Sequence, residues 1–257
     1  MNYHRFCFIL MIINYGSITS FSPTTDYCRV ECPQYTTHSV CQRRNNCEPI
    51  RGCVAIQSDD AFREHMVKAH NELRNNIANG SIKGPYGNIG ATNMNAISYD
   101  LELEFIASCW NNACYQLKHD DCRNTDRFWV GQNIWWGMGV NETIMAVSDW
   151  FNEIQYFLNP NWLKSFMDVN YPNDGNPMGH FTQVIWAETK YIGCSRVRYG
   201  PNSRETQIIC NYGPAGNVIG MSIYKMAEDS SKIANDCSNG VNEHYTSLCR
   251  TSVGHEN

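Results

Sequence analysis

The cysteines constrain the fold of this chain more than any other feature of its sequence. Thirteen cysteines occur in 257 residues. One of them, Cys7, lies in an N-terminal stretch, residues 1–20, that we interpret as a secretory signal. The remaining twelve are an even number, which suits six disulfide bonds in an oxidising compartment. Neither closely spaced cysteine pair has a second pair at metal-ligand spacing, which argues against zinc held by thiolates. The sequence therefore predicts a secreted, disulfide-rich protein.

The N-terminal stretch has the parts of a secretory signal. Arg5 supplies the positive charge, Phe6–Ile13 is the apolar core, and small residues follow. This core is too short to cross a bilayer, and no later stretch approaches the length of a membrane span. The formal net charge is −5, and the sequence contains no stripe of lysine and arginine residues. Both observations argue against a nucleic-acid partner. We expect a soluble extracellular monomer.

Hydrophobic periodicity divides the rest of the chain into three parts. Residues 21–57 carry five cysteines and little periodicity, so we expect a loop-rich arm tethered by disulfides. Residues 58–225 carry helical and strand patterns and form the main domain. Residues 226–257 form a polar extension in which Cys237 and Cys249 pair with each other.

Within the main domain, helical patterns come first and strand patterns follow. This order, without β-α-β alternation, is typical of the α+β class. Asn159–Met178 contains three prolines and is expected to be a long loop. On the third helix the residues expected to face inward are Ile144, Val147, Phe151, Ile154 and Leu158. The expected elements are a helix from Ser58 or Asp59 to about Asn79, helices over Asp100–Leu117 and Glu142–Leu158, and antiparallel strands over Tyr191–Tyr199 and Thr206–Tyr212.

Two cysteines, Cys109 and Cys114, lie five residues apart on the second expected helix. Helix geometry then points them about 140° apart and separates them by a rise of about 7.5 Å. That rise exceeds the roughly 7 Å between Cα atoms that a disulfide tolerates. We therefore expect them to pair with different partners.

Two sequence blocks carry a resemblance to a known family. They are Gly179–Cys194 (GHFTQVIWAETKYIGC) and Ile209–Gly220 (ICNYGPAGNVIG). The alternative is that they are two core strands with a solvated histidine between them. Together the blocks resemble the signatures of the CAP superfamily (cysteine-rich secretory proteins, antigen-five, pathogenesis-related group one). The cysteine pattern of the arm is similar to that of the antigen-five venom and salivary allergens of arthropods. The resemblance implies a three-layer α-β-α sandwich with an antiparallel sheet.

The resemblance also implies a cleft with two histidines and two acidic residues. The matching positions are His119, His180 and Glu153, while Gln132 replaces the second acid. Two imidazoles and a carboxylate can bind a divalent cation such as zinc, so these three are the candidate metal ligands. Because Gln132 is neutral, we expect weak zinc binding and no required cofactor. A hydrogen-bonded polar cluster and a general acid/base role for Glu153 with His180 are the alternatives. We take His70, in the similar first-helix motif, as structural.

Disulfide pairing follows in part from the same resemblance. It implies Cys28–Cys41, Cys32–Cys122 and Cys194–Cys210, and the tail pair Cys237–Cys249 closes the count. The position of Cys47 before His70 is close to the family spacing and favours Cys47–Cys114, which leaves Cys53–Cys109. The division of Cys47 and Cys53 between Cys109 and Cys114 stays open.

The function implied by the resemblance is that of a secreted, non-enzymatic venom or salivary effector and allergen. It would bind a host protein or a small apolar ligand. One alternative is a metal-dependent or serine-type hydrolase, although no G-x-S-x-G elbow occurs. The other is a channel-modulating toxin, although the tail has too few cysteines for that module.

Two further sets of residues are candidates for surface roles. Asn79 and Asn141 begin glycosylation sequons. Five aromatic residues could line an apolar groove for a fatty acid or sterol, or belong to the core: Trp135, Trp136, Trp162, Phe166 and Tyr171. For Trp135 and Trp136 we favour the core.

Overall fold

The computed structural model describes residues 23–84, 90–138, 142–167 and 177–251, without the side chains of 142–144. The expected signal, the sequon at Asn141 and the side chain of Tyr171 lie outside the described residues.

A five-stranded sheet lies at the centre of the fold. Its strands run in the order β1-β4-β5-β3, all antiparallel, and the short β2 pairs parallel with β4. The long β4–β5 hairpin places Cys194 directly opposite Cys210. The strands are β1 (Val54–Ile56), β2 (Ser98–Tyr99), β3 (Gly131–Met138), β4 (Tyr191–Tyr199) and β5 (Glu205–Gly213).

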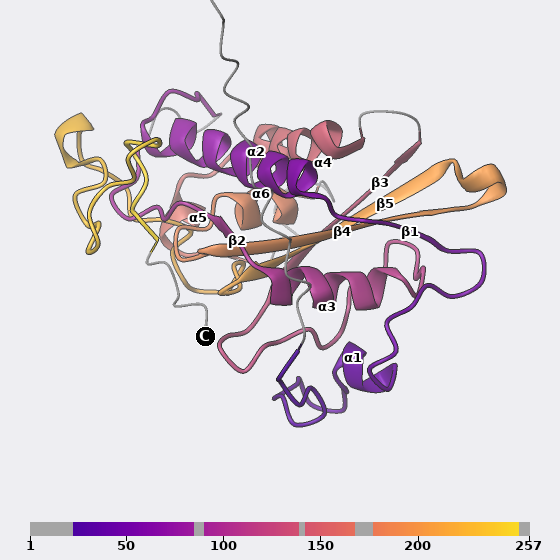
Figure 1. Cartoon of the computed structure of the whole chain (residues 1–257). Helices are drawn as coiled ribbons and strands as arrows, with labels where there is room; N and C mark the ends of the chain where they lie inside the picture. Colours follow the sequence, from indigo (N-terminus) through magenta and orange to yellow (C-terminus); the bar gives the residue numbers. More distant parts are fainter. Residues whose placement is uncertain (1–22, 85–89, 139–141, 168–176, 252–257) are drawn as a thin grey trace, which may run out of the picture.

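Helices cover both faces of the sheet (Figure 1). α3 packs on one face, against β4 and β5, while α2, α4 and α6 lie over the other. The expected α+β class and three-layer α-β-α sandwich are confirmed. The helices are α1 (Ser39–Gln42), α2 (Asp60–Ala78), α3 (Leu101–Asn111), α4 (Glu142–Asn152), α5 (Asn161–Lys164) and α6 (Gly179–Val184), with 3-10 helices over Glu153–Tyr156, Pro201–Ser203 and Ser230–Lys232.

Aspartate caps set the start of the two helices that pack on opposite faces of the sheet. Asp59 Oδ1 accepts a hydrogen bond from the Phe62 N–H at 2.8 Å, and Asp100 Oδ1 accepts one from Leu103 N–H at 2.9 Å. α2 runs to Ala78, with Asn79 as its C-cap, close to the expected end.

The third expected helix is interrupted. α4 ends at Asn152 and the chain continues as a 3-10 helix. Val147 and Phe151 are buried as expected, but Leu158 is 56% exposed. The tighter 3-10 turn breaks the 3.6-residue period, so the expected burial of Leu158 was wrong. The expected loop over 159–178 also contains the short α5.

The described residues form six disulfides, four of them as expected: Cys28–Cys41, Cys32–Cys122, Cys194–Cys210 and Cys237–Cys249. The other two are Cys47–Cys109 and Cys53–Cys114, so the pairing favoured from the sequence was reversed.

The reversal follows from where α3 ends. The helix stops at Asn111 rather than at Leu117, so Cys114 lies beyond it with a left-handed φ of 48°. There it packs with Cys53, which precedes β1 and contacts β4. Cys109, in the last turn of α3, instead faces the arm and packs with Cys47. Cys109 and Cys114 do pair with different partners, although they do not share a helix.

The main core lies between the sheet and the layer of α2, α4 and α6. Trp135 is 7% exposed within it, whereas its neighbour Trp136 is 41% exposed, because successive strand residues point to opposite faces. The expectation that both are core residues was therefore wrong for Trp136. Phe166 is buried, with an edge-to-face contact to Trp186 at 5.6 Å between ring centroids.

Arg74 of α2 carries its guanidinium into the interior, where it is fully buried. Its hydrogen-bond partners are all backbone carbonyls, and burial lowers its pKa to about 9. Most of these carbonyls belong to the end of α6 and the turn that follows, so Arg74 fixes the segment between α6 and β4. The acceptors are the carbonyls of Asn95, Val184, Trp186, Ala187 and Thr189.

We predict that Arg74→Lys destabilises the protein by about 3 kcal/mol or more. Lysine keeps the charge but has a single ammonium with three donors, so several buried carbonyls lose their partner. Urea unfolding with the disulfides intact measures the change. Arg250→Lys is the control, because this arginine is exposed and its side chain forms an ion pair with Glu243 among the described residues. Its change should stay within about 0.5 kcal/mol. Equal losses in the two variants would contradict the role given to Arg74.

Candidate functional site

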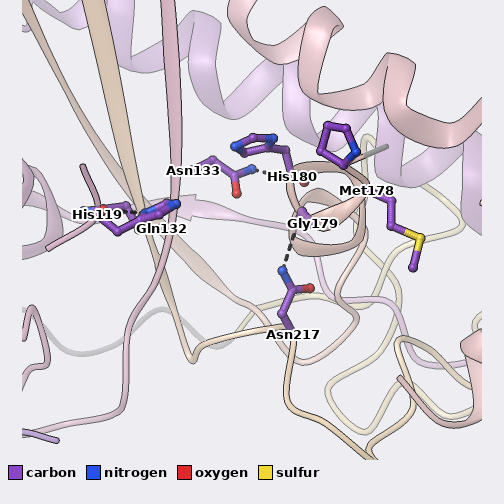
Figure 2. A pocket seen from close by; sticks show the side chains of 8 residues that line it. His119, Gln132, Asn133, Met178, Gly179, His180 and Asn217 are labelled. Atoms are coloured by element: carbon purple, nitrogen blue, oxygen red, sulfur yellow. Dashed lines mark hydrogen bonds between the residues drawn. The ribbon is translucent and has the colours of Figure 1, made fainter. Parts of the chain in front are cut away.

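A cavity of about 210 Å³ opens beside the start of β3 and the start of α6 (Figure 2). Its walls come from segments far apart in the chain: the loop after α3, strand β3, helix α6 and the loop after β5. The lining residues are His119, Gln132, Asn133, Pro177, Met178, Gly179, His180 and Asn217.

His119 is oriented by Gln132. The Gln132 side chain is 8% exposed, and its Oε1 accepts a hydrogen bond from the Asp120 backbone N–H at 3.1 Å. A backbone N–H can only donate, so it fixes which end of the amide faces His119. His119 Nδ1 lies 2.9 Å from the same Oε1 and must therefore carry a proton. The lone pair of His119 is left on Nε2. Desolvation lowers the pKa of His119, which favours the neutral ring.

His180 is oriented by Glu153. His180 Nδ1 lies 2.6 Å from Glu153 Oε1. The other carboxylate oxygen, Oε2, accepts the backbone N–H groups of His180 at 3.0 Å and Phe181 at 3.1 Å. Glu153 thus holds the imidazole and satisfies two free N–H groups in the first turn of α6. A neutral His180 then donates from Nδ1 and keeps its lone pair on Nε2.

The four residues expected in the cleft therefore form two pairs. Gln132 and Glu153 each hold the Nδ1 side of one histidine. Both histidines and Gln132 line the cavity, whereas Glu153 is not among the lining residues. The described part of the chain contains no group of three or more His, Cys, Asp or Glu side chains placed to hold a metal ion.

A chain of hydrogen bonds joins His180 to the core. Asn133 Nδ2 donates to the His180 carbonyl at 3.1 Å and to the Tyr212 hydroxyl at 3.2 Å. His70 Nδ1 donates to the Met66 carbonyl at 2.7 Å, so its Nε2 accepts from the Tyr212 hydroxyl at 2.9 Å. Burial lowers the pKa of His70 to about 4, so it is neutral in the folded protein at neutral pH. Its contacts are those of a structural residue.

The second sequence block holds the first in place. Asn217 Nδ2 donates to the Gly179 carbonyl at 2.8 Å (Figure 2). Asn217 Oδ1 accepts from the Thr182 hydroxyl at 2.7 Å. Gly131 allows β3 to approach α6 closely, because a Cβ at this position would lie 2.0 Å from Gln183 Oε1 of α6. Sequence reasoning missed Asn133, Asn217 and Tyr212 as site residues. The signal was present for two of them, since Tyr212 and Asn217 lie inside the second block.

The sequence profile of the cysteine-rich secretory protein (CAP) family matches residues 67–212. The chain belongs to this family. Among curated relatives it is similar to venom allergen 5 of Polistes dominula, with 32% identity over 85% of this chain and 97% of that protein. It is also similar to venom allergen 3 of Solenopsis invicta, with 36% identity over 79% of this chain and 90% of that protein. The resemblance to the antigen-five group is confirmed.

Solved structures of the CAP family have the same fold. The zinc-bound crystal structure of NaASP2 superposes with a TM-score of 0.60 and 28% identity, over 79% of this chain and 99% of that one. BmVAL-1 superposes with a TM-score of 0.64 and 25% identity, over 76% of this chain and 96% of that one. No helix in the described residues of this CAP protein is long and apolar enough to cross a membrane.

We predict that Tyr212→Phe destabilises the protein by about 1–3 kcal/mol. Loss of the hydroxyl leaves the buried His70 Nε2 without a donor and removes one acceptor from Asn133. Chemical unfolding with the disulfides intact measures the loss. Tyr199→Phe is the matched control, because this tyrosine is also buried but its hydroxyl makes no hydrogen bond to the described residues. If the two variants unfold at the same denaturant concentration, the proposed chain of hydrogen bonds does not contribute.

Proposed function

We propose that this protein is a secreted antigen-five-type effector that acts by binding and carries a weak zinc site on His119 and His180. The observation that carries the proposal is the orientation of the two rings. Each Nδ1 is held by a side chain that is 8% exposed, which leaves each Nε2 as the atom available to one shared cavity.

Secretion is supported by the chemistry of the cysteines. All twelve cysteines in the described residues are paired, which requires an oxidising compartment. The relatives are named as venom proteins. The apolar stretch over residues 1–20 would supply the signal.

The two histidines fit a borderline cation such as zinc, which would add the chemistry of a Lewis acid when bound. Gln132 and Glu153 would act as partners that orient the ligands, as carboxylate and carbonyl oxygens often do behind metal-bound histidines. With two imidazoles from the chain, the site would bind zinc weakly. The zinc-bound relative NaASP2 supports the choice of metal.

Binding rather than catalysis is supported by what the cavity contains. Among the described residues, the eight that line it include no serine, threonine, cysteine or lysine that could serve as a nucleophile. Glu153 could act as a base, but its oxygens already accept from the His180 ring and two backbone N–H groups. The hydrolase alternative depends on this Glu153–His180 pair.

The shape of the site bears on the choice of ligand. A cavity of about 210 Å³ is smaller than the roughly 300–1,000 Å³ of typical small-molecule pockets. Phe166, expected to line a lipid slot, is buried against Trp186, and Trp162 packs edge-to-face on Phe157. We therefore favour a host macromolecule, bound at the outer surface, over a fatty acid or sterol.

We predict micromolar or weaker zinc binding that is lost in His119→Ala and in His180→Ala. Gln132→Glu should raise the zinc affinity by about tenfold or more. Changes of residues that hydrogen-bond to a metal-bound histidine have effects of roughly this size. The charged carboxylate introduced at position 132 would accept the hydrogen bond from His119 Nδ1 and make the ring a stronger metal ligand. The amide of Asn211 would have to rotate so that its NH₂ group donates to the second carboxylate oxygen.

Zinc affinity should fall below about pH 6.5, where histidines gain protons and cannot bind metal. Because the pKa of His119 is lowered, this ring stays neutral and able to bind zinc at lower pH than an ordinary histidine.

Calorimetry on chelator-treated protein measures these affinities. His244→Ala is the control, because this histidine is exposed and outside the cavity. Equal zinc affinity in the His180→Ala and His244→Ala variants would show that zinc binds elsewhere. Zinc-dependent turnover of a peptide or ester that disappears in Glu153→Gln would overturn the non-enzymatic proposal.

A further inference from the structure

A second hollow, of about 290 Å³, lies between the end of α2 and the C-terminal extension. In Figure 1 the yellow extension lies beyond the end of the purple helix α2. This hollow shares no lining residue with the histidine cavity. Its walls are Asn79, Gly80, Gly90, Ala227, Glu228, Asp229, Ser230 and Ile233.

Backbone hydrogen bonds hold the walls of this hollow together. The Ala91 N–H donates to the Ala78 carbonyl at 2.9 Å, the Ala227 N–H to the Gly90 carbonyl at 2.8 Å, and the Ala234 N–H to the Ala91 carbonyl at 3.0 Å. Just beyond, the Cys237–Cys249 disulfide closes the extension, and the Cys249 N–H donates to the Met94 carbonyl at 2.7 Å. The hollow is therefore a preformed feature of the fold.

Asn79, on the rim of this hollow, begins the sequon Asn79-Gly80-Ser81. Its Oδ1 accepts the Ser81 backbone N–H at 2.8 Å and the Ser81 hydroxyl. The backbone donor fixes the amide so that Oδ1 faces Ser81 and Nδ2 faces away. Asn79 is half-buried, and its Nδ2 makes no hydrogen bond to the described residues. Nδ2 is the atom to which an N-linked sugar is attached.

The chemistry of the walls suits a sugar. The carboxylates of Glu228 and Asp229 can accept hydrogen bonds from hydroxyl and amide groups, and Ile233 gives an apolar surface for a ring face. The volume of about 290 Å³ is just below the roughly 300–1,000 Å³ of small-molecule sites. That size suits one sugar ring rather than a branched chain.

We propose that Asn79 carries an N-linked glycan whose first N-acetylglucosamine sits in this hollow. The donor is a lipid-pyrophosphate oligosaccharide of the secretory pathway. The Asn79 Nδ2–C1 bond forms as the C1–O bond to the pyrophosphate breaks, Nδ2 loses one proton, and the lipid pyrophosphate leaves. The glycan then bridges α2 and the C-terminal extension.

The test uses the full chain secreted from insect cells behind a standard leader, in an Asn141→Gln background so that only the first sequon remains. An inhibitor of mannose trimming keeps the glycan sensitive to endoglycosidase H. Mass spectrometry of the peptide that contains Asn79 should show the glycan in most molecules, and Ser81→Ala should remove it. An unmodified Asn79 in the secreted, folded protein overturns the proposal.

Two enzymes then separate the first sugar from the rest. Endoglycosidase H leaves one N-acetylglucosamine, whereas peptide-N-glycosidase F removes it and converts Asn79 to aspartate. We expect the Tm to be unchanged by the first treatment and about 2–4 °C lower after the second, as for one or two lost hydrogen bonds in a domain of this size.

Two variants serve as controls for this comparison. Asn79→Asp should match the fully deglycosylated protein, which shows that the treatment itself does no harm. Ala227→Leu fills the hollow and should abolish the difference between the two enzymes. Equal Tm values after both treatments, or a difference that survives Ala227→Leu, would show that the first sugar does not sit there.

Discussion

The buried guanidinium of Arg74 is the interaction on which the site depends. A charge in a protein interior is costly unless its hydrogen bonds are satisfied, and here backbone carbonyls satisfy them. Most of those carbonyls lie where α6 ends and the chain turns into β4. Holding this turn sets the position of α6, and α6 carries His180. The position of the second histidine is therefore anchored from α2, more than a hundred residues earlier in the chain.

The other end of α6 is anchored by Glu153, which gives one carboxylate two tasks. It orients the imidazole of His180 and satisfies the first N–H groups of a helix too short to be stable alone. Gln132 has the corresponding task for His119, through an amide that the Asp120 N–H keeps in one orientation. Removing either partner would therefore disturb a ring and the backbone near it together.

The sequence predicted what local signals decide. The candidate caps Ser58 and Asp59 located the start of α2 to within one residue, and alternation located β4 and β5. The family resemblance named His119, Gln132, Glu153 and His180. Long-range contacts decided the rest. β1 exists because Cys53 brings it to the edge of β4, and α6 forms because Glu153 caps it from 27 residues upstream. The end of α3 and the exchange of Cys47 and Cys53 depended on tertiary packing that no local pattern contains.

The N-terminal arm shows what its disulfides mean for recognition by antibodies. It is joined to the domain through Cys32–Cys122, Cys47–Cys109 and Cys53–Cys114, which link residues 90, 62 and 61 positions apart. An antibody that bound this surface would contact segments that lie far apart in the sequence, which is a discontinuous epitope. Linear peptides from the arm would not reproduce that epitope, and reduction would dismantle it. Serology on fragments would then underestimate how strongly the native surface is recognised.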